Sequence, residues 1–367
     1  MSDTLVASTR KGLFVFERHA DGWRHSHHAF LGDKVVASLA DPRDGVWYAA
    51  LDLGHFGSKL HCSRDHGRHW TELTVPAYSE GDSVATGDGK PPRPATLELI
   101  WTLCVGGHDQ PGRLWAGTIP GGLFRSDDSG QSWELQRGLW DRPERLQWFG
   151  GGYDAAGIHS ICVDPRDSRC LRVAVSCGGV WRSDDDGANW EVACTGMFAA
   201  YMPEERKFDP NIQDPHCMVQ CEAAPDALWV QHHNGIFRST DGGHQWTEVT
   251  HAQPSNFGFA VGVHPKKPDT AWFVPAIKDE RRVPVDGRLV VSRTTDGGKT
   301  FEVLSSGLPK LSYDLIYRHA LAVDAAGQRL AIGSTTGGLW VSEDGGDDWI
   351  DVGVRLPPVY ALDFVPG

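Results

Sequence analysis

One short pattern, Ser/Thr-x-Asp-x-Gly-x-x-Trp/Phe, occurs six times in this chain of 367 residues. The copies start 48 to 63 residues apart, at Ser63, Ser126, Ser183, Ser239, Thr294 and Ser342. A repeat of that length holds about four short strands, and repeats of four strands are typical of radial β architectures. The spacing therefore predicts an all-β propeller.

Each copy has a local reason to form a turn. The Asp carboxylate can accept hydrogen bonds from backbone N–H groups of its own turn. The Gly can adopt a positive φ at little cost, and the Trp or Phe then covers the turn with apolar surface. Alternating runs such as Leu123-Phe124-Arg125 precede the copies, as expected for strands that enter a hairpin.

The six copies resemble the repeats of the Asp-box (BNR) β-propeller family, which occur in sialidases, sortilin-like receptors and photosystem assembly factors. The resemblance covers nearly the whole chain. In that family the box is a structural hairpin on the rim, away from the ligand site. The resemblance therefore implies that the box Asp residues are not catalytic.

The two ends of the chain supply one further set of strands. Residues 4–8, 13–17 and 23–26 have strand-like sequence without an inner strand, and residues 360–365 can provide it. We expect a single domain of seven blades, closed by pairing of the C-terminal strand with the N-terminal blade, because closure removes exposed strand edges. The predicted blades are 1–33 plus 359–367, 34–96, 97–156, 157–214, 215–256, 257–317 and 318–358.

Composition limits the partners. The net charge is −13 and the chain has no dense basic stripe, which argues against a nucleic-acid partner. No apolar run of 18 residues and no secretory segment occur, so we expect no membrane partner. The eight Cys form no CxxC pair, which indicates reduced thiols in a cytoplasmic protein. The oligomeric state is left open.

Long insertions point to one face of the propeller. Segments 76–97, 138–157, 195–215 and 276–288 all emerge where the inner strands start, and the box turns lie at the opposite face. Long irregular loops on one face of a rigid scaffold commonly carry function. We therefore expect the functional site at this mouth of the central channel.

Histidines are predicted to converge at the same mouth. Aligning the blades puts His159 and His319 at one register of their inner strands, and His216 opens another inner strand at nearly the same height. Imidazole is a common ligand for Zn, Mn, Fe and Ni. The sequence thus predicts a divalent metal held by these three histidines. His232 or His233 would be a further ligand, and at most one of the two can face the site because neighbours on a strand point to opposite faces.

Two other interpretations fit the same residues. In a metal-free enzyme, Glu98 or a histidine would move protons, Tyr317 could donate one, and Arg10 or Arg318 would hold an anionic substrate. Alternatively, the histidines are structural and bond to backbone and water along a wet channel. No compact metal motif such as HExxH decides between them.

The favoured prediction is a hydrolase or lyase that acts on a small polar or anionic molecule, with a metal that polarises an oxygen or activates water. A non-catalytic binding or assembly-factor propeller is one alternative, and an exo-sialidase-like glycoside hydrolase is another. The resemblance to sialidases implies an Arg-Ile-Pro motif near the N-terminus. Here the stretch is Ser8-Thr9-Arg10-Lys11-Gly12, without Ile-Pro, which weighs against sialidase activity.

Overall fold

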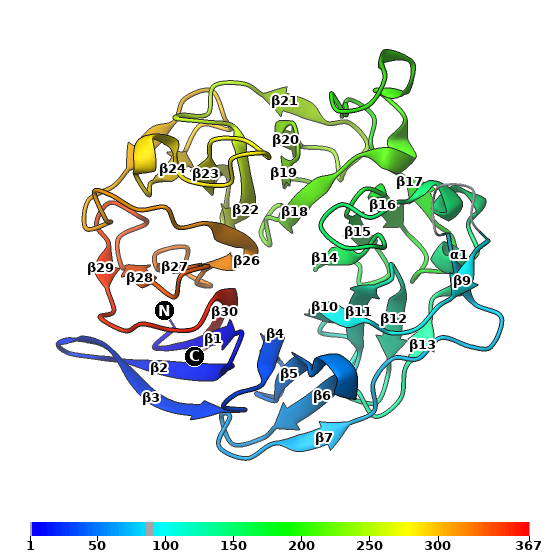
Figure 1. The fold of residues 1–367 in the computed structure, drawn as a ribbon, viewed down its shortest axis with the longest axis horizontal. Helices are drawn as coiled ribbons and strands as arrows, with labels where there is room; N and C mark the ends of the chain where they lie inside the picture. Colours follow the sequence, from blue (N-terminus) through cyan, green and yellow to red (C-terminus); the bar gives the residue numbers. More distant parts are fainter. Residues whose placement is uncertain (1, 86–90, 367) are drawn as a thin grey trace.

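The computed structural model describes residues 2–85 and 91–366. Its regular structure is almost entirely β-strand, and Figure 1 shows the sheets arranged around a central axis. In each four-stranded sheet the first strand lies nearest the axis and the later strands follow outwards. The all-β class predicted from the repeats is therefore present, and the repeats set the radial order of the strands.

Within the described residues, five separate sheets each contain four antiparallel strands, ordered from the inside outwards. Their strands are β4 (Lys34–Ala40), β5 (Trp47–Asp52), β6 (Ser58–Ser63) and β7 (Thr71–Leu73); β10 (Leu99–Val105), β11 (Leu114–Ile119), β12 (Leu123–Ser126) and β13 (Glu134–Leu135); β14 (Ile158–Val163), β15 (Leu171–Val175), β16 (Gly179–Ser183) and β17 (Glu191–Val192); β18 (Pro215–Gln220), β19 (Leu228–His232), β20 (Gly235–Ser239) and β21 (Thr247–Val249); β22 (Phe257–His264), β23 (Lys267–Ala276), β24 (Val291–Thr294) and β25 (Glu302–Leu304).

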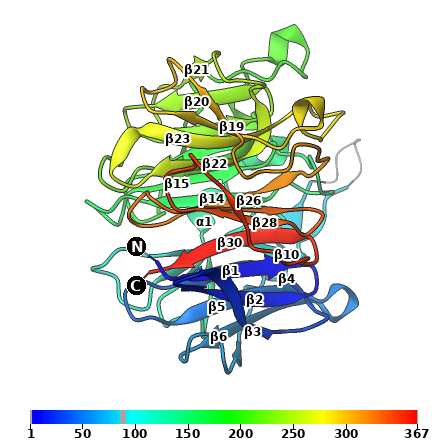
Figure 2. The ribbon, with the colours of Figure 1, turned by 90° about the vertical axis from the view of Figure 1, so that its left-hand side faces the viewer.

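A further sheet of the described chain has eight strands and contains both chain ends. Its order is β29 (Ile350–Asp351), β28 (Leu339–Ser342), β27 (Leu330–Ser334), β26 (Ile316–Val323), β30 (Val359–Val365), β1 (Thr4–Thr9), β2 (Gly12–His19) and β3 (Gly22–Ala29). β30 pairs with β1 along its length, whereas β26 meets β30 in one parallel bridge, His319 to Ala361. The side view in Figure 2 shows β30 beside β1 and the two termini close together. β26 begins two residues before the predicted boundary at 318.

The remaining elements are short. β8 (Ser83–Val84) and β9 (Arg93–Pro94) form a small separate ladder. The helical turns are α1 (Arg137–Trp140), η1 (Gly54–Phe56), η2 (Pro143–Gln147), η3 (Glu204–Arg206), η4 (Pro210–Ile212) and η5 (Val285–Gly287). No helix in the described ranges is both long and apolar enough to span a bilayer. All eight cysteines carry free thiols.

The six repeated turns share one hydrogen-bond pattern. In the third copy, Ser183 Oγ donates to Asp185 Oδ1 at 2.9 Å and accepts from the N–H of Gly187 at 3.0 Å. Asp185 Oδ1 also accepts the N–H of Asn189 at 2.8 Å, and the equivalent bond in the other five copies measures 2.9 to 3.0 Å. The box carboxylates are thus occupied by their own turns.

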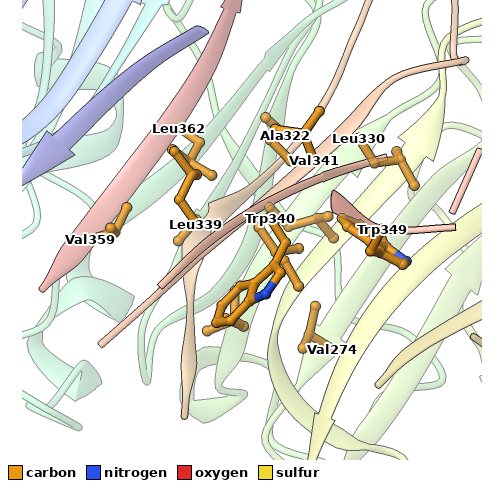
Figure 3. Packing of buried hydrophobic residues seen from close by; sticks show 14 of the residues in the cluster. Val274, Ala322, Leu330, Leu339, Trp340, Val341, Trp349, Val359 and Leu362 are labelled. Carbon is orange, nitrogen blue, oxygen red and sulfur yellow. The ribbon is translucent and has the colours of Figure 1, made fainter. Parts of the chain in front are cut away.

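The core lies between the faces of neighbouring sheets. Trp340 on β28 and Trp349 after it pack with Leu330, Leu339 and Val341, as Figure 3 shows. The same cluster reaches Val359 and Leu362 of β30 and Val274 of β23, so it ties β30 to strands far away in sequence. Full burial of side chains of this size contributes about 1.5–3 kcal/mol each to folding. This packing holds the inner strands rigidly around the axis.

Candidate functional site

A central cavity of about 790 Å³ opens at the end where the inner strands start. Because the strands of each sheet alternate in direction, this end is opposite the six box turns. Inner strands β4, β10, β18, β22, β26 and β30 line the cavity, and so do parts of segments 138–157, 195–215 and 276–288. The described residues of segment 76–97 do not contribute, and residues 86–90 lie outside the described ranges.

Aromatic side chains form much of the cavity wall. Trp101 meets Tyr153 edge to face with ring centroids 5.3 Å apart, and Tyr317 stacks on Tyr360 at 5.9 Å. The other aromatic residues of the wall are Phe149, Tyr201, Phe257 and Phe259. Charged and polar side chains form the rest of the wall, so the cavity can contact both apolar faces and polar groups of a ligand.

A buried carboxylate, Asp214, lies between two imidazoles. Its Oδ1 accepts hydrogen bonds from the backbone N–H of Cys177 at 3.1 Å and the hydroxyl of Ser176 at 3.2 Å. Its Oδ2 lies 3.5 Å from His216 Nε2 and 3.4 Å from His233 Nδ1. Burial raises the pKa of the Asp214 carboxyl, but the two imidazoles outweigh burial and hold that pKa well below its usual range. Asp214 is therefore an anchored, ionised carboxylate, and we call these three residues the Asp–His group.

Both imidazoles of the Asp–His group are held in place. The Nδ1–H of His216 donates to the carbonyl of Gly258 at 2.7 Å, which leaves Nε2 directed toward Asp214. The His216 ring also stacks on Phe259 at 4.5 Å. The backbone N–H of His233 donates to the carbonyl of Asp214 at 2.9 Å, and its ring meets Tyr201 edge to face at 4.7 Å.

Arg318 brings a cation to the same cavity. Its Nε–H donates to the carbonyl of His216 at 2.6 Å, and its guanidinium lies over the ring of Trp101 at 4.4 Å. Burial lowers the pKa of Arg318 from its ordinary value. Among the described residues, no carboxylate forms an ion pair with Arg318, whereas the cavity cations Lys34, Lys278 and Arg282 all have acidic partners. Arg318 is thus the cation available to an anionic ligand.

The structure does not bring His159, His216 and His319 into one ligand set. The Nε2–H of His159 donates to the carbonyl of Pro215 at 2.7 Å, its Nδ1 lies 2.9 Å from Ser160 Oγ, and its side chain lies outside the cavity. His319 does line the cavity, but its Nε2–H donates to the carbonyl of His159 at 2.7 Å. Burial lowers the pKa of both rings, to about 4 for His319 and well below its ordinary value for His159.

The adjacent histidines separate as expected for neighbours on a strand. His233 lines the cavity, whereas His232 is fully buried outside it, against Phe237. Backbone N–H groups of Asp214 and Asn234 lie 3.1 Å from the two ring nitrogens of His232. Burial lowers the pKa of His232 to about 3, so this ring is neutral. Its role is structural.

Two of the four proposed catalytic residues lie outside the cavity. Glu98 forms an ion pair with Arg93, and Arg10 is exposed, with its backbone N–H bonded to Pro358. Glu98 stands immediately before inner strand β10, but its side chain does not line the cavity. Tyr317 and Arg318 both line the cavity.

Sequence reasoning missed Asp214 and Trp101. Asp214 stands two residues before His216 at the beginning of an inner strand, and positions i and i+2 of a strand share a face. That spacing was a usable signal. Trp101 has no comparable signal, because an apolar residue in a buried strand gives no sign of which side it faces.

No model of a known protein family matches the chain. A probable oligoxyloglucan-reducing end-specific xyloglucanase of Neosartorya fischeri is 24% identical over 356 residues, which cover 89% of this chain and 40% of the relative. Xyloglucanase Xgh74A of Acetivibrio thermocellus is 27% identical over 146 residues, 35% of this chain and 16% of the relative. The chain thus spans less than half the length of either relative.

Solved structures show the same architecture. An ancestral GH74 enzyme superposes with a TM-score of 0.59 at 16% identity, over 84% of this chain and 36% of that one. YCF48 from Cyanidioschyzon merolae superposes with a TM-score of 0.53 at 13% identity, over 88% of this chain and 87% of that one. These likenesses, together with the radial sheets, show that the chain is a β-propeller.

Proposed function

We propose that the protein is a hydrolase that binds a carbohydrate in the central cavity and cleaves it with a water molecule activated by the Asp–His group. The observation that carries this proposal is the placement of an anchored, ionised Asp214 between His216 and His233 at an aromatic-walled cavity. Asp214 Oδ2 can accept a hydrogen bond from a water and hold it in place, and His216 Nε2, whose ring donates its Nδ1–H to Gly258, is positioned to take a proton from that water. The matches to xyloglucanases support hydrolysis of a glycosidic bond.

Arg318 supports a substrate with an anionic group. The Arg318 guanidinium lies in a partly apolar cavity and has no acidic partner within the described part of the chain. It would therefore bind a carboxylate or phosphate of the ligand most strongly, because these groups accept two parallel hydrogen bonds from it. The aromatic walls provide flat apolar surfaces for the rest of the ligand. An acidic sugar combines both features, whereas the relatives named as xyloglucanases favour a polysaccharide over the small molecule expected from the sequence.

The strand pairing also supports a ring of seven four-stranded blades. The eight-stranded sheet divides at the single bridge between His319 and Ala361 into two groups of four, β26 to β29 and β30 with β1 to β3. With the five separate sheets, we propose that these make the seven blades that place the cavity on the axis.

The test is hydrolysis of a panel of oligosaccharides, some neutral and xyloglucan-derived and some containing uronic or sialic acids, followed by chromatography of the products. We expect cleavage of an acidic member. Asp214→Asn should lower kcat at least about 100-fold, the usual contribution of acid–base groups. Arg318→Gln should raise KM for the acidic substrate.

Glu98→Gln is the matched control, because it removes a carboxylate outside the cavity. It should leave kcat and KM unchanged. A folded wild-type protein that cleaves no member of the panel, or an Asp214→Asn variant with full activity, would refute the proposed function.

A further inference from the structure

We infer that Asp214 Oδ2, His216 Nε2 and His233 Nδ1 bind one divalent transition-metal cation in the central cavity. Only the role of this cation in catalysis rests on the proposed function, since binding itself follows from the geometry of the three ligand atoms. The ligand set differs from the His159, His216 and His319 set expected from the sequence. It includes a carboxylate and retains only His216 from that trio.

The spacing of the ligand atoms fits a shared cation. The three atoms all lie within 4.8 Å of one another, and Asp214 Oδ2 is 3.5 Å and 3.4 Å from the two ring nitrogens. Ligand atoms about 2.1 Å from one metal ion and separated by a tetrahedral angle lie roughly 3.4 Å apart. The same distances exceed those of ordinary N–H···O hydrogen bonds, so direct contact satisfies these atoms poorly.

Neighbouring groups orient two of the ligands. His216 donates its Nδ1–H to the carbonyl oxygen of Gly258, and Nε2 is then available as a metal ligand. Ser176 and Cys177 occupy Asp214 Oδ1 and leave Oδ2 directed at the imidazoles. Metal-binding histidines and carboxylates are typically held by such outer contacts, which fix the ring orientation and the donor atom.

The donor types select the class of cation. Two imidazoles and one carboxylate suit Zn²⁺, Fe²⁺, Mn²⁺ or Ni²⁺, whereas Ca²⁺ and Mg²⁺ prefer sites made of oxygen ligands. Three protein ligands leave coordination positions for water or substrate, as in catalytic rather than structural sites. His233 is only partly buried and lines the cavity, so the open positions face the substrate space. There the cation would lower the pKa of a bound water, the step that hydrolysis requires.

The test is cation binding by the full chain without an affinity tag. The protein is treated with a chelator, dialysed, and titrated with Zn²⁺ or Mn²⁺ by calorimetry, and its metal content is measured by mass spectrometry. Co²⁺ loading adds visible d–d absorption, whose intensity reports the coordination number of the bound cation. We expect about one equivalent per chain. His233→Ala and Asp214→Asn should each weaken binding at least about 100-fold, more than loss of an outer contact does.

His55→Ala is the matched control, since His55 is an exposed histidine outside the Asp–His group. It should bind as the wild type does. Circular dichroism and the melting temperature establish that each variant is folded. Because His233 is partly exposed, His233→Ala should disturb the fold less than Asp214→Asn does. No binding of any of these cations at about 100 µM, or unchanged binding in both variants, would overturn the inference.

The two proposals fail separately. Hydrolysis that depends on Asp214 in a protein that binds none of these cations would leave the proposed function standing and refute the cation site. If the wild type binds one equivalent of cation, both variants lose that binding, and no sugar is hydrolysed, the cation site stands and the proposed function is refuted.

Discussion

At the scale of single residues, the role of each histidine is decided by which ring nitrogen has a partner. His159 and His319 use Nε2 to bond the carbonyls of other inner strands, and burial keeps both rings neutral. His216 uses Nδ1 for the same purpose and thereby leaves Nε2 facing Asp214. One type of residue thus ties the strands together around the axis and also lines the cavity beside Asp214.

A half-buried acid on β30 gives a prediction about pH. Asp363 on β30 accepts a hydrogen bond from Ser38 on β4, and burial raises the pKa of Asp363 to about 6. Since this folded-state pKa exceeds the unfolded value, the charged form costs stability. The cost is absent below the unfolded pKa near 4, grows as pH rises toward 6 and is complete above it.

Asp363→Asn should therefore stabilise the protein by about 1 to 2 kcal/mol at pH 8 and have little effect at pH 4. Denaturant unfolding at the two pH values measures this difference. The exposed Asp33→Asn is the control and should show no comparable pH-dependent gain. An equal effect of Asp363→Asn at both pH values would contradict the assignment.

At the scale of elements, the box turns are built by neighbouring sheets as well as by their own residues. The backbone N–H of Trp349, in the last box, donates to the carbonyl of Ser306 after β25 at 3.0 Å, and Trp246 bonds Thr195 in the same way at 2.8 Å. The next residues, Gly307 and Gly196, lie so close to these tryptophans that a Cβ would meet the Trp carbonyl oxygen. The segments that follow β17 and β25 are thus each joined to the box of the next repeat by a glycine contact.

Gly307→Ala should accordingly destabilise the protein strongly. A Cβ at this position would lie 1.7 Å from Trp349 O, and φ is +76°. Gly353→Ala is a matched control, because Gly353 has a φ of +77° with nothing within 4 Å of the added Cβ. The control should cost about 1 to 2 kcal/mol from backbone strain alone. Gly307→Ala should cost at least about 2 kcal/mol more in thermal or denaturant unfolding, and equal losses would show that the contact does not matter.

The same elements show how far sequence reasoning reaches. The box turns close within seven residues, so their bonds depend on the local sequence, and the all-β class follows from their spacing. The register of the inner strands places histidines at one end of the axis. It does not give the direction of each side chain or the path of loop 195–215, which positions Asp214. The Asp–His group therefore needed tertiary information, and the His159–His216–His319 trio was predicted in its place.

At the scale of the whole molecule, the two chain ends are joined by β30. This strand pairs with β1 from Thr4 opposite Val365 to Thr9 opposite Val359. Its Val359 and Leu362 are buried in the cluster that also holds Trp340 of β28 (Figure 3). Tyr360 of the same strand lines the cavity, so the joining strand also forms part of the site.

Removal of residues 359–367 should therefore abolish cooperative folding. The truncated chain loses the partner of β1 and the burial of two large apolar side chains, together at least about 5 kcal/mol, which is comparable with the whole stability of a typical domain. It also exposes an unpaired strand edge, which favours aggregation. Calorimetry and light scattering should show no sharp transition and a rise in large species, whereas a control chain ending at Val365 should unfold as the intact protein does.

A synthetic peptide of residues 359–367 should restore part of the transition when added in excess, because β30 makes its contacts through non-covalent pairing. If the truncated chain had an unchanged melting temperature, the propeller would be stable without β30, and the prediction would be wrong.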